Sequence, residues 1–96
     1  MTIRAGASAA LYGAFYENGE RITNLSSYSI QCRLLTIEGK EIKNKDSKIK
    51  TASDGSICVI LDAEDTTNLK GRVLFTFRLK QGGETISEIT KDFDVV

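Results

Sequence analysis

Apolar and polar residues alternate at every second position along most of this chain. Strands produce this pattern because successive side chains point to opposite faces of a sheet. The clearest runs cover residues 72–80 and 28–36. Further runs predict strands at residues 8–16, 20–23, 40–42, 48–51, 56–61 and 84–96. In the strand 56–61, Cys58 and Ile60 lie opposite the apolar residues Ile57 and Val59, so we expect both of its faces to be buried.

Turn signals separate these runs. Asn-Gly and Asp-Gly pairs favour tight turns because their residues tolerate positive φ. Pairs of this kind occur at Asn18-Gly19 and Asp54-Gly55, and glycine marks two further turns at Glu38-Gly39 and Gln81-Gly82-Gly83. Residues 62–69 break the alternation, and Asp62 at their start predicts a single capped helical turn.

Together these elements predict an all-β fold. We expect an immunoglobulin-like antiparallel β-sandwich of about seven strands with one short helical turn, and a small barrel as the alternative. Residues 1–96 are expected to form one domain. The hairpin 72–96 should lie centrally because it has the longest apolar face. Ile86 is out of phase with Ile89, Phe93 and Val95, which predicts a β-bulge near Ser87.

Composition narrows the function classes. The chain has 96 residues, with 13 Lys+Arg and 13 Asp+Glu, so its formal net charge is zero. Nucleic-acid binders usually carry a basic excess that neutralises phosphates, so no nucleic-acid partner is expected. Histidine, the commonest general base and zinc ligand, is absent. We therefore expect no enzyme, no metal and no cofactor. No long apolar run predicts a membrane span, and no export signal is evident.

Two charge clusters and two cysteines were candidates for chemistry. Helix capping explains the acidic cluster Asp62, Glu64 and Asp65 better than a calcium loop does. The basic run predicts a solvated loop or a guarded sheet edge, and comprises Lys40, Lys43, Lys45, Lys48 and Lys50. Cys32 and Cys58 are expected to be reduced thiols, although both lie in predicted strands and a disulfide between them is conceivable.

The tyrosines are the candidate interface residues. Tyr12 and Tyr16 share the face opposite Leu11 and Phe15. An exposed face would make them a subunit-contact patch, whereas the alternative is a second buried layer. Together with Tyr28 they are also the only aromatic side chains suited to a carbohydrate-binding platform.

The order of turns and strands resembles that of small phage and prophage proteins. The features run from Thr2-Ile3-Arg4-Ala5-Gly6 through Ile22–Tyr28, Asp54-Gly55-Ser56-Ile57 and Leu61–Thr66 to Leu69-Lys70-Gly71-Arg72. In this order they resemble the N-terminal β-sandwich domains of phage baseplate upper proteins. Ala7 stands where that family often has Asp, and Arg72-Val73 where it often has an aromatic residue.

The resemblance implies a phage or prophage structural module, associated with a tail or baseplate and acting through protein–protein contacts. Its expected partners are further copies of itself or other virion subunits, and its expected location is the cytoplasm of the bacterial host and then the virion. A carbohydrate-binding or adhesion module and a small inhibitor or regulator of a host protein are the alternatives.

Overall fold

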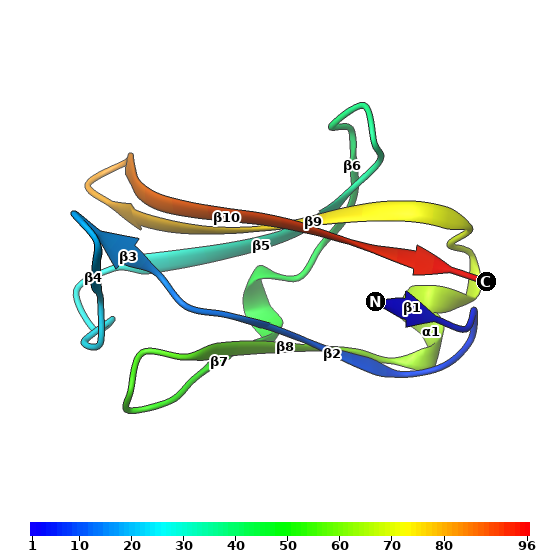
Figure 1. Ribbon diagram of the computed structural model, residues 1–96, viewed down its shortest axis with the longest axis horizontal. Coiled ribbons are helices and arrows are strands. Elements are labelled where there is room, and N and C mark those ends of the chain that lie inside the picture. The colour runs from blue at the N-terminus through cyan, green and yellow to red at the C-terminus, as the bar shows by residue number, and fades with distance from the viewer.

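The computed structural model describes all of residues 1–96 and is an all-β fold (Figure 1). Its strands are β1 (Thr2–Ile3), β2 (Ala9–Gly13), β3 (Tyr16–Glu17), β4 (Glu20–Arg21), β5 (Ser29–Leu35), β6 (Glu41–Asn44), β7 (Ile49–Thr51), β8 (Ile57–Leu61), β9 (Gly71–Gln81) and β10 (Glu84–Val95). A 3₁₀ turn, η1 (Asp46–Lys48), precedes β7, and the short helix α1 (Ala63–Thr67) joins β8 to β9. No helix is long and apolar enough to cross a membrane.

Most strands lie in two sheets that form two layers (Figure 1). The larger sheet has the order β1-β10-β9-β5-β6, and the smaller has the order β2-β8-β7. The strands β3 and β4 pair only with each other, as a hairpin at one end. Strand β1 is the exception to antiparallel pairing, because it runs parallel to the last two residues of β10.

One apolar core fills the space between the layers. The larger sheet supplies buried residues such as Phe77 and Phe93, and the smaller sheet supplies Leu11, Val59 and Leu61. Both runs that showed the clearest alternation face this core with their apolar side chains. The period-two pattern therefore identified the buried face of these two strands, β5 and β9, correctly.

The predicted turns and the predicted bulge are confirmed. Register shifts between Thr85 and Ser87 where β10 pairs with β9, as the phase of Ile86 predicted. The predicted helical turn is α1, and Asp62 caps it by accepting a hydrogen bond of 3.0 Å from the Asp65 backbone N–H. Asp65 returns a bond to the Asp62 backbone N–H, which completes a capping box.

Three expectations about strands need correction. The structure has more strands than the seven or so expected, because the two-residue strands β1 and β3 show no pattern of their own, whereas β4 is the short strand expected over 20–23. The run 8–16 is divided between β2 and β3, because the chain leaves the sheet where Phe15 enters the core. Strand β9 is central as expected, but β10 is covered by β1 only at Asp94 and Val95.

Candidate interaction surface

Three exposed apolar side chains lie on or beside β2. Tyr12 is 64% exposed, Tyr16 is 54% exposed and Ile60 of the neighbouring strand β8 is 46% exposed. Tyr12 is paired with Cys58, and Ala10 with Ile60, so these four residues share the outer face of the smaller sheet. Tyr12 and Tyr16 are therefore not part of a second buried layer. The prediction that both faces of β8 are buried was wrong at Ile60.

A seam opens beside this face, between β2 of one layer and β10 of the other. A hollow of about 480 Å³ is lined there by Tyr12, Tyr16, Ile89 and Lys91, among others. A second hollow, of about 450 Å³, shares Tyr12 and Lys91 with the first and continues along β2. The two hollows thus form one shallow groove, which we call the β2–β10 seam.

Gly13 holds the layers close together at the floor of the seam. A Cβ at this position would lie 3.1 Å from Phe77 Cδ2 and 3.2 Å from Ile89 Cδ1. With any other residue here, the side chains of Phe77 and Ile89 would have to give way by a few tenths of an ångström, so glycine suits this close approach of β2 to the β9–β10 hairpin.

Lys91 is the free cation of the seam. It lies opposite Phe75 in the β9–β10 pairing and so on the core-facing side of β10, yet its side chain reaches solvent and forms no ion pair. An inward-facing charge on an open edge strand is one of the devices that discourage strand pairing at that edge. Alternation places Lys91 on the same face as Ile89 and Phe93, but only the strand order shows that this part of β10 is an open edge beside β2.

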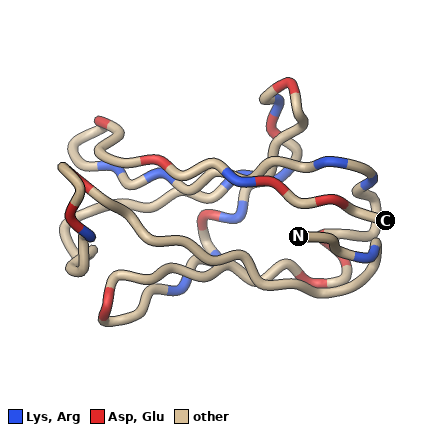
Figure 2. The backbone as a smooth tube through the Cα atoms, in the orientation of Figure 1, with Lys and Arg blue, Asp and Glu red and all other residues tan.

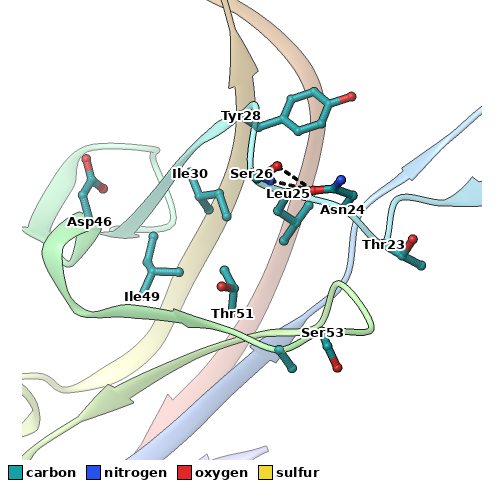
Figure 3. Close-up of a pocket in the computed structure, with 11 residues that line it drawn as sticks. Thr23, Asn24, Leu25, Ser26, Tyr28, Ile30, Asp46, Ile49, Thr51 and Ser53 are labelled. Atoms are coloured by element: carbon teal, nitrogen blue, oxygen red, sulfur yellow. Dashed lines mark hydrogen bonds between the residues drawn. The ribbon is translucent and has the colours of Figure 1, made fainter.

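Tyr28 lies elsewhere. It lines a separate depression of about 660 Å³ between residues 23–30 and 46–53, and Figure 3 shows its ring at the rim. No lining residue is common to this depression and the seam. The structure therefore brings Tyr12 and Tyr16 together but not Tyr28.

Asn24, Ser26 and Asp46 of the Tyr28 depression are hydrogen-bonded within the chain. The side-chain oxygen of Asn24 accepts hydrogen bonds from the Ser26 backbone N–H and hydroxyl, at 3.1 and 2.7 Å (Figure 3). Asp46 accepts bonds from the Cys32 backbone N–H at 2.8 Å and from Arg33. The bonds from Arg33 hold the pKa of Asp46 below its usual value. These contacts stabilise the loops around the depression.

A second charged cluster ties the basic run to α1. Asp65 is buried and accepts bonds from the ammonium groups of Lys45, at 2.7 Å, and Lys43, at 2.9 Å. Burial by itself would raise the pKa of Asp65, but the two lysines outweigh it and lower this pKa to about 2. Asp65 in turn raises the pKa of Lys43. The prediction of a solvated basic run was wrong for Lys45, which is 6% exposed.

The two cysteines are free and lie on different faces. Cys32 points into the core, whereas Cys58 lies on the outer face of the smaller sheet. Burial, with a contribution from Asp46, raises the pKa of the Cys32 thiol to about 12. A thiol so rarely ionised is a poor nucleophile, because the thiolate is the reactive form.

No known protein family matches this chain, and no curated protein sequence matches it. Neither comparison therefore assigns a role to the seam. The arrangement itself is suited to contact with another macromolecule, since it joins exposed tyrosines, an exposed isoleucine and open strand edges.

Proposed function

We propose that this chain is a structural module of a phage or prophage particle, associated with its tail or baseplate, that works through protein–protein contacts. The observation that carries the proposal is the exposed apolar group Tyr12, Tyr16 and Ile60 beside the β2–β10 seam. Tyrosine is favoured at protein interfaces because it offers a large apolar body with a polar tip. Clustered exposed apolar side chains of this kind mark interaction sites on otherwise polar surfaces.

The fold supports the same proposal. Two antiparallel layers joined by a short helical crossover suit an immunoglobulin-like sandwich, the class to which we assign the chain. Such sandwiches are rigid scaffolds whose function lies in their surface. The resemblance of the turn and strand order to baseplate domains supplies the biological setting: assembly in the host cytoplasm, incorporation into the virion, and contacts with virion subunits rather than nucleic acid.

The test is the composition of purified particles. Particle production is induced in the strain that carries the gene. The particles are purified on a density gradient, and their proteins are quantified by mass spectrometry. The proposal predicts this chain in fixed ratio to the major tail protein. It also predicts that the double variant Tyr12→Lys/Tyr16→Lys folds but is lost from particles.

The control is Ile37→Lys, a substitution of an equally exposed apolar residue in the turn after β5. This variant should enter particles as the unmodified chain does. A chain found only in the soluble fraction, and never in particles, would contradict the proposal.

A carbohydrate-binding or adhesion module is the second candidate, because two exposed tyrosines line one groove with Ser56 and Lys91. It predicts that oligosaccharides shift the amide resonances of Gly13 and Ser56, and that Tyr12→Ala abolishes the shifts. If the chain enters particles but its resonances do not respond to any oligosaccharide, the carbohydrate-binding function is excluded and assembly remains.

A further inference from the structure

The open edge of β2 presents its backbone to solvent at alternate residues. The Ala52 N–H donates to the Ser56 C=O, 2.8 Å, so the backbone groups of Ser56, and of every second residue after it in β8, face β7. The groups of Ile57, Val59 and Leu61 then face β2, because antiparallel strands alternate in this way. Their partners in β2 are Gly13, Leu11 and Ala9. It follows that Ala10 and Tyr12 direct their N–H and C=O groups away from the sheet, where no strand meets them.

This edge lacks the charges that the edge strands β6 and β7 carry. Strand β6 carries Glu41 and Lys43, and β7 carries Lys50. From Ala5 to Tyr16 there is no charged residue, and the strand β2 is accordingly tan throughout in Figure 2. Proteins normally block exposed edges with charges or proline, because unpaired edges recruit other strands. An edge left unblocked is suited to pairing.

The side chains of β2 are complementary to a second copy of the same strand. If two copies run antiparallel with Leu11 opposite Leu11, Tyr12 of each lies opposite Ala10 of the other. A large ring then meets a small side chain, and beyond Ala10 in the same row lies Ile60, against which the ring can pack. This register also sets the outward N–H and C=O groups of Ala10 against those of Tyr12 in the second copy.

We propose that two copies of this chain pair through β2, antiparallel about Leu11, so that their three-stranded sheets join into one six-stranded sheet. The inference rests on the proposed function and names one of its contacts. The charged residues that share the seam with β2 are Lys91 and Asp92, which carry opposite signs and add no net charge there. The zero net charge of the chain also avoids long-range repulsion between copies.

The first test uses proline at two equivalent edge positions. Ala10→Pro removes an N–H that the pairing needs but that β8 does not use, and proline is tolerated on edges where the N–H faces solvent. Thr51→Pro makes the matched change at the far edge of the same sheet, in β7, where the N–H also faces away from β8. Light scattering behind size exclusion, over a concentration series, measures the mass of each.

We expect the unmodified chain and Thr51→Pro to reach twice the chain mass of 10.5 kDa as concentration rises, and Ala10→Pro to remain a monomer. Circular dichroism confirms that each variant is folded. An unmodified chain that stays monomeric throughout overturns the proposal and leaves the edge to an extended strand of another particle subunit. A dimer that survives Ala10→Pro overturns it as well.

A second pair of variants keeps the test decisive if proline disturbs the fold. Tyr12→Lys and Ile42→Lys each place a charge at an exposed apolar residue of an edge strand, one in β2 and one in β6. Tyr12→Lys should raise the dimer dissociation constant at least ~10-fold, and Ile42→Lys should leave it unchanged; equal effects overturn the proposal. The particle assay is independent, since a monomer that still enters particles overturns only the β2 pairing, and a dimer absent from particles overturns only the function.

Discussion

Asp65 takes part in a helix cap and in two salt bridges at once. It completes the capping box of α1 and accepts bonds from Lys43 and Lys45, while its side chain and that of Lys45 are almost completely buried. Removing one member of a buried ion pair leaves the other charge without compensation, which is more costly than losing both.

Asp65→Ala should therefore destabilise the fold by about 3–5 kcal/mol in urea unfolding. The double variant Lys45→Met/Asp65→Ala should regain much of that loss, because no buried ammonium is left unpaired. Glu64→Ala, an exposed neighbour in the same helix, is the control and should change stability by less than about 0.5 kcal/mol. A double variant no more stable than Asp65→Ala would contradict this account of the pair.

The same carboxylate predicts a dependence on pH. Its pKa falls from 3.8 to about 2 on folding, so the folded state holds the proton less tightly than the unfolded state. The lowered pKa contributes about 2 kcal/mol to the free energy of unfolding. This contribution is complete above pH 5 and disappears as pH falls toward 2. Urea unfolding from pH 7 to pH 2 should show the stability difference between the unmodified chain and Asp65→Asn narrowing over this range. A constant difference would count against the lowered pKa.

The capping role of Asp62 and Asp65 could be predicted from sequence because a cap is local. The pairing of Asp65 with Lys45 could not, since it joins residues that the topology, and not the local pattern, brings together. Lys45 therefore looked like one more solvated lysine in a basic run. Lys45 lies between β6 and η1, and its backbone N–H donates to the Cys32 carbonyl oxygen at 2.8 Å, which holds this part of the chain against β5.

At the scale of elements, the turn between β7 and β8 is fixed against the chain that leaves β4. Gly55 has φ +86°, and a Cβ there would lie 2.8 Å from Thr23 Cα and closer still to the Ile22 carbonyl oxygen. Gly39, in the turn between β5 and β6, has φ +88° with nothing within 4 Å. The two glycines therefore share a backbone conformation but differ in surroundings.

Gly39→Ala should cost about 1–2 kcal/mol, the strain of a left-handed conformation alone. Gly55→Ala should cost at least about 2 kcal/mol more, because backbone atoms must also move. Thermal unfolding of both variants measures the difference. Equal losses would show that the Ile22–Thr23 segment yields freely to the new side chain.

Alternation predicted the main strands because each has one face against the core. It did not predict β1, since two residues carry no period and the pairing of β1 with β10 joins the two ends of the chain. It also misjudged Ile60, because a pattern shows which residues share a face but not whether another layer covers that face. The exposed outer face of the smaller sheet is therefore visible only in the structure.

At the scale of the whole molecule, the two layers place the two thiols in different environments. Cys58 should react with a thiol reagent such as DTNB far faster than Cys32, whose pKa of about 12 leaves roughly 10⁻⁴ of it ionised at pH 8. Cys58→Ser should remove the fast phase and leave one slow equivalent that appears fully on unfolding. A protein in which neither cysteine is a free thiol would contradict the structure.

The candidate surface was partly accessible from sequence. Tyr12 and Tyr16 could be named because they share a face opposite Leu11 and Phe15. The β2–β10 seam, the free cation Lys91 and the separation of Tyr28 from the other tyrosines could not, because they depend on strand order across two sheets. The uncharged segment 5–16 can be read from the sequence, but it indicates an unprotected edge only because the structure shows that β2 is an edge strand.

The measurement that most directly tests contact through this edge is amide hydrogen exchange, followed by NMR over a series of protein concentrations. Exchange reports protection residue by residue. We predict that the amides of Ala10 and Tyr12 become protected as concentration rises, while the outward amide of Thr51 in β7 exchanges equally fast throughout. Rapid, concentration-independent exchange at Ala10 and Tyr12 would contradict the account, because an edge that pairs with a second copy cannot leave those amides open to water.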